Sequence, residues 1–216
     1  MRVKFLTKDV GVVEALYKGG RLPKKQAILQ PFTPFWLSLN VRNDFYFVRS
    51  LEAESYSFDL PGKILFAGFY LNEIISSMFM PFDGGAILFK SYSDTIEQLS
   101  NTSFDKIEPI LRKFELVLLT EAGYAFSLKH DATTGDLIQA HNTYKFIPNL
   151  GFILSSDGFL GEYILAFAKE DFSHPGTLRM AKMVMRQAIY FATNGAKLRS
   201  KQLFCHHVSN TSNSLN

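Results

Sequence analysis

Short runs of apolar residues, separated by turn-forming residues, dominate the first sixty positions of the chain. The runs lie at residues 5–6, 10–16, 27–29, 35–39 and 45–48. Glycine, proline and polar clusters separate them at intervals typical of a small sandwich or barrel of short strands. The string Phe58-Asp59-Leu60-Pro61-Gly62 then ends the pattern, because proline and glycine interrupt strands. The sequence therefore predicts a β-rich unit over residues 1–60.

From residue 63 the apolar residues recur at the three- and four-residue steps of amphipathic helices. This spacing predicts helices over residues 63–79, 86–99, about 103–122 and 175–193, with a short basic helix at 200–207. Between them, the segment 125–160 contains turns and short β-like runs at 144–147 and 151–154. The expected fold is therefore α+β: a β-rich domain over 1–60, then a mostly helical domain over 61–216 with a small β-like insert.

Composition indicates a folded protein of a reducing cytoplasm. The chain of 216 residues is 47% hydrophobic and 14% aromatic, which is enough to bury a sizeable core. A single cysteine, Cys205, cannot form an internal disulfide or build a thiolate metal site alone. No stretch approaches the roughly 20 apolar residues that a membrane-spanning helix needs. The start of the sequence also has too short an apolar core for a signal peptide. We expect a cytoplasmic protein without membrane contact.

Charge is unevenly distributed, although the net charge is only +3. Residues 1–49 carry nine Lys or Arg against three Asp or Glu, and residues 160–216 carry seven against three. Residues 50–159 carry seven against fourteen. Two basic ends around an acidic middle favour contact with a polyanion at the ends. The alternative is an uneven solvated surface, which is common.

The densest basic cluster surrounds the glycine pair Gly19-Gly20 in the β-rich unit. Its members and possible extensions are Lys18, Arg21, Lys24 and Lys25, then Lys8, Arg42 and Arg49. Glycines let a backbone approach phosphates closely, and a loop lets several cations converge on them. The cluster is a candidate DNA-binding surface, and its alternative is a solvated hairpin tip. Most aromatic residues of this unit are expected inside the barrel, with Trp36 or Tyr46 as the exposed exceptions.

A second basic group lies near the C-terminus. Its members are Arg179, Lys182, Arg186, Lys197, Arg199 and Lys201. The first three recur at three- and four-residue steps, which places them along one face of a helix. They predict a second DNA surface. The alternative is an ordinary solvated helix face.

The sequence contains none of the common catalytic strings. No Gly-x-x-x-x-Gly-Lys loop, Gly-x-Gly-x-x-Gly turn or Gly-x-Ser-x-Gly elbow occurs. His130, Asp131 and His141 do not follow the spacing of a zinc site. The adjacent residues Cys205-His206-His207 cannot share one face as ligands, or as a nucleophile and its base. We expect no catalytic residue, no metal and no cofactor.

Seven short strings occur in an order and spacing that resemble the RecO family of bacterial recombination mediators over nearly the whole chain. They are Leu6-Thr7-Lys8 with Gly11-Val12-Val13; Lys18-Gly19-Gly20-Arg21; Gln30-Pro31-Phe32-Thr33-Pro34; Gly68-Phe69-Tyr70-Leu71-Asn72-Glu73; Leu111-Arg112-Lys113-Phe114-Glu115 with Gly123-Tyr124; Tyr144-Lys145-Phe146 with Gly151-Phe152; and Leu198-Arg199-Ser200-Lys201-Gln202-Leu203-Phe204. Each string alone is weak, and their common order makes the resemblance specific.

The resemblance implies an N-terminal OB-fold barrel, over residues 1–60, followed by a helical domain. It implies binding of single- and double-stranded DNA, annealing of complementary strands, and loading of RecA together with RecR. It also implies docking of the acidic, Phe-ended tail of single-stranded-DNA-binding protein. Two departures follow from the residues. Family members usually begin with a further segment, so we expect this barrel to lack its first strand. Some relatives carry a four-cysteine zinc site where residues 125–160 contain no cysteine, so a metal-free remnant is expected there.

The same resemblance assigns a peptide pocket to the third predicted helix. Its expected residues are Leu111, Arg112, Phe114, Lys182 and Arg186. By its place in the string, Arg112 matches the family arginine implicated in docking the tail, and a guanidinium can hold a carboxylate through two hydrogen bonds. The alternative is an intrahelical ion pair of Arg112 with Glu108 or Glu115.

Three other functions stay open from the residues. A generic OB-type RNA- or ribosome-binding module would prefer structured RNA and would not bind the acidic peptide. An enzyme of unrecognised type would need a deep polar pocket with perturbed titratable groups. A degenerate relative that keeps only the helical domain would bind the peptide without binding DNA strongly.

Overall fold

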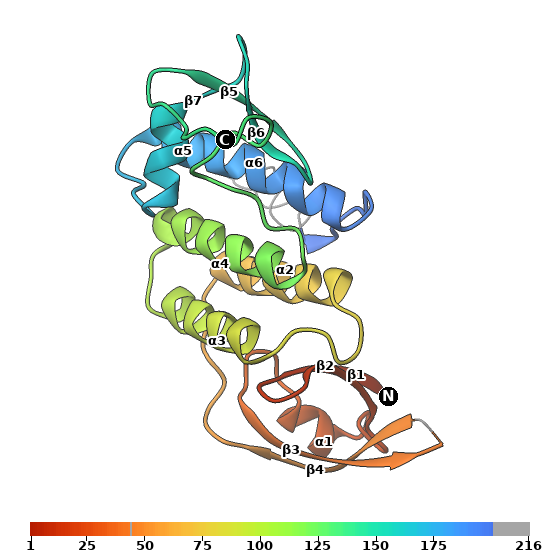
Figure 1. The fold of residues 1–216 in the computed structure, drawn as a ribbon. Coiled ribbons are helices and arrows are strands. Elements are labelled where there is room, and N and C mark those ends of the chain that lie inside the picture. The colour runs from red at the N-terminus through yellow and green to blue at the C-terminus, as the bar shows by residue number, and fades with distance from the viewer. Residues whose placement is uncertain (44, 201–216) are drawn as a thin grey trace.

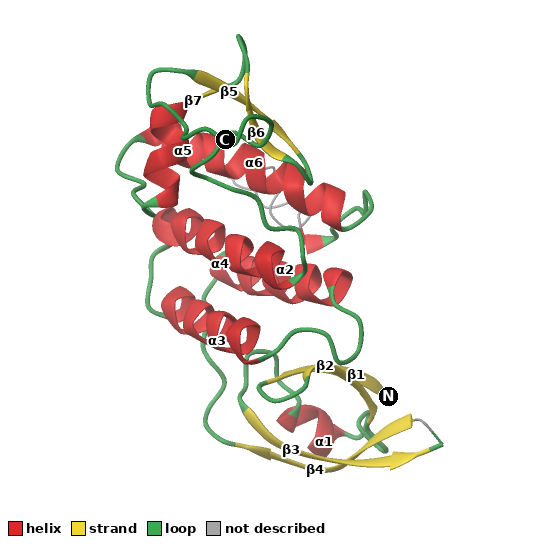
Figure 2. Ribbon diagram, in the orientation of Figure 1, coloured by secondary structure: helices red, strands yellow, loops and turns green. Residues whose placement is uncertain are grey.

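The computed structural model describes residues 1–43 and 45–200. Figure 1 shows an elongated molecule with a sheet at its N-terminal end, helices across its middle, and a second, smaller sheet with two further helices at the other end. Figure 2 shows the same division by secondary structure. The fold is α+β, with a β-sheet at the N-terminus and a helical region that includes a small sheet, as the apolar pattern predicts.

Four strands form the N-terminal sheet in the order β1-β2-β4-β3. They are β1 (Arg2–Thr7), β2 (Gly11–Leu16), β3 (Phe35–Arg42) and β4 (Phe45–Ala53). The two outer pairs are antiparallel, and β2 and β4 pair in parallel through Ala15 opposite Tyr46 and Leu16 opposite Phe47. Among the described residues β1 and β3 each have one neighbouring strand only. The predicted sheet is therefore present, and its closure into a barrel is not seen.

The prediction of a strand over residues 27–29 is wrong, because this segment belongs to a helix. The helix α1 (Pro23–Ile28) has proline at its first turn, where the fixed φ of proline suits a helix and its missing N–H is not needed. None of its residues is buried. The apolar residues 27–29 resemble a short strand only because a run of three is too short to show a period.

Three helices cross the middle of the molecule, close to the predicted ranges. They are α2 (Ile64–Met78), α3 (Ala86–Ser100) and α4 (Ile107–Glu121), the last preceded by a 3-10 turn at Phe104–Lys106. Their facing sides form the main core, in which Leu71, Ile74, Leu88, Phe114 and Leu118 are almost fully buried. At about 1.5–3 kcal/mol for each large apolar side chain, this burial is the main force that holds the helices together.

The C-terminal end combines a three-stranded sheet with two helices. The sheet has the order β6-β5-β7, formed by β5 (Thr143–Ile147), β6 (Gly151–Leu154) and β7 (Phe159–Leu160). Helix α5 (Gly161–Ala168) was not predicted, because its eight residues are mostly apolar and show no polar face. Helix α6 (Pro175–Ala192) packs against α4 and α5. The predicted helix at 200–207 lies outside the described residues, apart from Ser200.

The side chain of Asp131 stabilises the turns of segment 125–160 by hydrogen bonds. This is the segment for which a metal-free remnant was expected. The Asp131 side chain accepts hydrogen bonds from the backbone N–H groups of Thr133, Thr134 and Leu154, at 2.7, 3.1 and 2.6 Å. Behind it, Phe126, Phe146 and Phe152 pack edge to face and tilted. In the described part of the chain no cluster of three His, Cys, Asp or Glu side chains is placed to hold a metal ion.

The N-terminal sheet is hydrogen-bonded directly to the loop that joins α2 and α3. The N–H of Val12 donates to the carbonyl of Asp83, and the N–H of Phe82 donates to the carbonyl of Val12. Gly11 has φ +70°, and a Cβ there would overlap the Asp83 carbonyl oxygen, so only glycine fits this approach. The loop between α2 and α3 therefore fixes the start of β2. None of the helices in the described chain has the length and apolarity required to span a membrane.

Candidate nucleic-acid interface

The loop between β2 and α1 is a tight, hydrogen-bonded turn. The N–H of Gly20 donates to Tyr17 and the N–H of Leu22 donates to Gly19, whose φ of +72° favours glycine. Gly20 is buried, and a Cβ there would lie 2.8 Å from the Tyr17 ring and 2.9 Å from Met1. The glycine pair therefore gives the basic residues around it a defined backbone to project from.

Lys25 supports this turn from α1. Its Nζ donates to the carbonyl of Lys18 at 2.9 Å and lies 4.8 Å from the centre of the Tyr17 ring, in a cation–π contact. Lys18, Arg21 and Lys24 are exposed, and within the described residues none of them has an ion-pair partner. We call Lys18, Arg21, Lys24 and Lys25 the loop cluster. It presents uncompensated positive charge on an ordered turn.

The other three predicted DNA-binding residues are dispersed over the sheet. Lys8 lies in the β1–β2 turn, at the opposite end of β2 from the loop cluster, and Arg42 lies at the tip of the β3–β4 hairpin. Arg49 is exposed on β4. Six residues of β2 separate Lys8 from the loop cluster by about 20 Å at a strand's rise per residue. The structure thus separates Lys8 from the loop cluster. Arg49 follows Phe47, the partner of Leu16, by two residues and therefore lies at the end of β2 from which the loop cluster starts.

Exposed aromatic side chains accompany these cations on the sheet. Trp36 is 67% exposed on the edge strand β3, as expected. The expected aromatic core of this unit is not seen, because Phe32, Phe35 and Phe47 are only half-buried. Tyr46 is half-buried, with its ring 5.0 Å from that of Phe82, and Phe45 is exposed instead. Aromatic faces of this kind can stack with bases. The sequence offered Trp36 as exposed, whereas Phe45 is identified only by its exposure in the structure.

Arg112 lies inside the molecule and pairs with an acid of its own helix. Its Nη2 is 3.0 Å from Oε1 of Glu115, and the side chains are 9% and 0% exposed. The hydroxyl of Tyr70 on α2 donates to the same Glu115 oxygen at 2.5 Å. Burial, and then the nearby Glu115 carboxylate, raise the pKa of Tyr70 well above its usual value, so the phenol stays a neutral donor. The intrahelical pair that the sequence offered as an alternative is therefore formed, with Glu115.

The five residues of the predicted peptide pocket differ in their exposure. Leu111 and Phe114 are buried with Arg112 in the core of α4, whereas Lys182 and Arg186 are exposed on α6. Lys182 forms an ion pair with Glu108, the second acid that the sequence offered as a partner for Arg112. The role of Arg112 in docking a peptide stays a prediction, and its guanidinium is already engaged.

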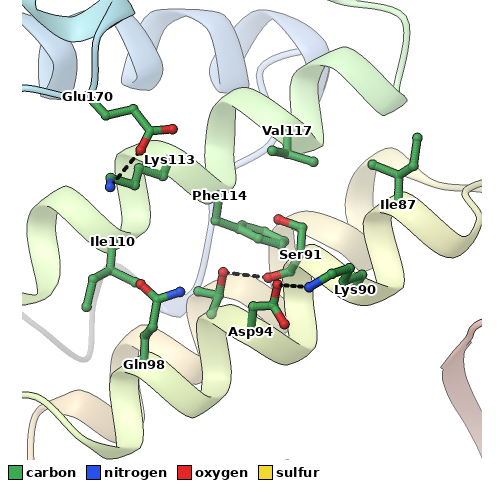
Figure 3. Close-up of a pocket in the computed structure, with 11 residues that line it drawn as sticks. Ile87, Lys90, Ser91, Asp94, Gln98, Ile110, Lys113, Phe114, Val117 and Glu170 are labelled. Atoms are coloured by element: carbon green, nitrogen blue, oxygen red, sulfur yellow. Dashed lines mark hydrogen bonds and ion pairs between the residues drawn. The ribbon is translucent and has the colours of Figure 1, made fainter.

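A groove of about 330 Å³ lies between α3 and α4 (Figure 3). Its apolar lining includes Phe114, Ile110 and Val117. Lysines stand at its rim, and each is neutralised: Lys90 by Asp94 at 2.6 Å, and Lys113 by Glu170 at 2.7 Å. The remaining lining residues are Ile87, Ser91, Thr95 and Gln98. The groove is apolar with balanced charge, and it offers an acidic ligand no free cation.

The second basic group occupies the outer face of α6 and the segment after it. Arg179, Lys182 and Arg186 are exposed on this helix, which contains no acidic residue. Lys197 and Arg199 are also exposed, and Lys201 lies outside the described residues.

The segment after α6 is held to α2 by one carboxylate. Glu73 accepts hydrogen bonds from the backbone N–H groups of Arg199 and Ser200, at 2.7 and 2.8 Å. Burial would raise the pKa of Glu73, but the hydrogen bonds from Ser200 and Arg199 outweigh it and lower the pKa. The carboxylate therefore stays charged and anchors the last described residues.

Comparisons with known proteins agree with one another. The family model described as "Recombination protein O C terminal" matches residues 62–183, which is more than half of the chain. The DNA repair protein RecO of Legionella pneumophila (strain Lens) is 40% identical over 205 residues, covering 94% of this chain and 90% of that protein. The DNA repair protein RecO of Actinobacillus pleuropneumoniae serotype 7 (strain AP76) is 35% identical over 208 residues, covering 94% and 86%. These matches define a class of bacterial DNA repair proteins. The chain belongs to the RecO family, and the resemblance seen in the seven strings is confirmed.

Proposed function

We propose that this chain is a recombination mediator that binds single- and double-stranded DNA through the loop cluster and anneals complementary strands. Membership of the RecO family supports the general role in DNA repair and recombination. The observation that carries the DNA-binding part is the exposure of Lys18, Arg21 and Lys24 on one ordered turn, without an ion-pair partner in the described chain. Cations that already pair with carboxylates would have to exchange one partner for another, whereas these can bind phosphates directly.

The mechanism needs no reacting group. Each cation that contacts a phosphate releases condensed counterions from the nucleic acid, and this release drives binding without regard to sequence. Strand annealing then requires that the repulsion between two polyanions is reduced while bases pair. Exposed Trp36 and Phe45 on the same sheet would stack with unpaired bases and leave duplex DNA free of that contact. The protein acts by binding and not by catalysis.

The family resemblance extends the proposal to partners. The chain would reach protein-coated single strands by docking the acidic, Phe-ended tail of single-stranded-DNA-binding protein. With RecR it would then promote loading of RecA onto those strands. This recruitment step needs a surface for an acidic peptide, separate from the loop cluster that holds DNA.

The test removes three charges from the loop cluster and compares the effect with the loss of three charges elsewhere. Lys18→Gln, Arg21→Gln and Lys24→Gln are combined in one variant. A control variant carries Lys129→Gln, Lys145→Gln and Lys169→Gln, at positions that are equally exposed. Binding of labelled single-stranded and duplex oligonucleotides is followed by fluorescence anisotropy over a range of salt concentrations. Losing three phosphate contacts should lower the slope of log K against log salt by about 2 for single strands and about 2.7 for duplex.

The control variant should keep the slope of the unsubstituted chain, because both variants lose the same net charge. Equal slopes for the two variants would show that binding follows net charge and would remove the loop cluster from the mechanism. A clear preference for structured RNA over DNA in the same titration would replace the proposal with an RNA-binding module.

A further inference from the structure

The outer side of α6 carries a continuous basic surface. Exposed residues recur there at three- and four-residue steps, and these steps follow one side of a helix. We call these residues the α6 face: Arg179, Lys182, Met183, Arg186, Gln187 and Tyr190. Residues 172–199 carry five Lys or Arg and no Asp or Glu. No acid of its own helix therefore neutralises this face.

The three cations of the α6 face are available to an anionic ligand. Arg179 and Arg186 form no ion pair within the described residues, and they lie about 10.5 Å apart along the axis at the rise of a helix. Lys182 between them pairs with Glu108, but the two side chains are 59% and 33% exposed. Exposed pairs of this kind are weak, so a phosphate can replace the carboxylate. The face thus offers a row of cations to a polyanion.

An exposed aromatic ring continues this row. Tyr190 is 62% exposed and lies one turn after Arg186. A Cβ at Gly195 would lie 3.1 Å from the Tyr190 hydroxyl, so this glycine leaves the ring room beside the turn that ends the helix. In proteins that bind single-stranded nucleic acid, bases stack on such rings while neighbouring cations hold the phosphates. The combination therefore favours a nucleic-acid strand as the ligand.

An acidic layer separates the α6 face from the loop cluster. The loop cluster belongs to the N-terminal end of the elongated molecule and α6 to the other end, with α2, α3 and α4 between them (Figure 1). Residues 61–121, which contain these three helices, carry five Lys or Arg against eight Asp or Glu. Such a layer repels a polyanion, so it breaks any path of one strand from one basic surface to the other. The two surfaces are therefore separate sites.

We propose that the α6 face is a second nucleic-acid site, and that one chain holds two nucleic-acid segments at once, one at each end. The inference rests on the proposed function, which assigns the first segment to the loop cluster. Annealing requires that two complementary strands meet. A chain with a site at each end raises the local concentration of one strand around the other, as any linked pair of binding sites does.

The experiment measures whether one chain joins two strands that cannot pair. Biotinylated oligo-dT of about 15 nucleotides, the length of one binding site, is fixed to streptavidin beads, loaded with protein and washed. Fluorescein-labelled oligo-dT is then added, and the fluorescence retained on the beads is measured. The full chain is compared with the loop-cluster variant and the control variant described above. The fourth protein, the α6 variant, combines Arg179→Gln, Lys182→Gln and Arg186→Gln, and circular dichroism checks that each variant is folded.

The α6 variant should load onto the beads and fail to retain the second strand. At 0.1 M salt, three phosphate contacts with a single strand contribute a factor of about 100 to binding, so the second strand should be held about 100-fold more weakly. The number of strands bound per chain in a stoichiometric titration should fall from two to one. The control variant loses the same charge and should keep both strands.

A mixture of the α6 variant and the loop-cluster variant tests whether a single chain is responsible. If two associated chains each held one strand, the mixture would regain the retained fluorescence, because each variant keeps one site. If one chain holds both strands, the mixture stays at the level of the separate variants, as we expect.

Recovery in the mixture, or normal retention by the α6 variant, would overturn the inference and leave the loop-cluster proposal standing. Normal binding and retention by the loop-cluster variant would instead remove the loop cluster from the mechanism, and the inference with it.

Discussion

The buried pair of Arg112 and Glu115 gives the sharpest prediction about stability. Arg112→Met keeps the volume and the apolar stem of the side chain but removes its charge. Glu115 then stays in the core without the guanidinium 3.0 Å away, while Tyr70 still donates to it. Removing one member of a buried ion pair costs about 3–5 kcal/mol, because the remaining buried charge loses its guanidinium counter-charge.

The assay is urea unfolding followed by circular dichroism, with a thermal melt as a second measure. For a chain of this size, about 3–5 kcal/mol corresponds to a fall in Tm of about 6–20 °C. The double variant Arg112→Met, Glu115→Gln should recover at least half of the loss, because the amide oxygen still accepts from Tyr70 and both charges of the Arg112–Glu115 pair are removed. A single variant within about 1 kcal/mol of the unsubstituted chain would refute the reasoning and show that water reaches Glu115.

Two further predictions concern turns. Asp131→Ala should destabilise the C-terminal sheet by about 1–3 kcal/mol, since three backbone N–H donors lose their acceptor. Burial would raise the pKa of Asp131, but these donors outweigh it and lower the pKa. The stability that Asp131 contributes is therefore full above its unfolded pKa of about 3.9 and is lost as pH falls through the lower folded pKa. The unfolding free energies of the unsubstituted chain and of Asp131→Ala should converge at that low pH, and parallel curves would contradict this. Gly11→Ala should lower the free energy of unfolding by at least about 1–2 kcal/mol because of its positive φ, and overlap with the Asp83 carbonyl should add to this. The control is Gly62→Ala, where φ is also positive but nothing lies nearby. Equal urea midpoints for the two variants would show that the close approach to Asp83 has no cost.

Helices with a clear apolar stripe were predictable from sequence, and short elements were not. Helices α2, α3, α4 and α6 each place apolar residues at helical steps over at least four turns, so the period determines them. Helix α5 has eight residues without a polar face, and α1 has six without a buried one. Strand β1 begins at Arg2, three residues before the predicted apolar pair Phe5-Leu6. Polar and apolar residues alternate from Arg2 to Phe5, and this alternation extends the strand.

The candidate sites show the same limit. The loop cluster follows from sequence because its residues are neighbours in the chain. The groove between α3 and α4 does not, because its lining residues are spread along the chain from Ile87 to Glu170. The burial of Arg112 could not be read from its string either, since a basic residue next to an apolar stripe can face either way. Only the packing of α2, which brings Tyr70 to Glu115, decides it.

The hydrogen bonds between Val12, Phe82 and Asp83 have a consequence for folding during synthesis. The β-rich segment 1–60 emerges from the ribosome first, but the start of β2 acquires its partners only when the loop between α2 and α3 has followed. Domains generally fold as units in the order of their synthesis, and contacts distant in sequence form late. The nascent chain should therefore complete its N-terminal sheet only after α2 and the loop that follows it have been synthesised. A fragment that stops at residue 60 would remain incompletely folded, although the sequence marks that position as a boundary.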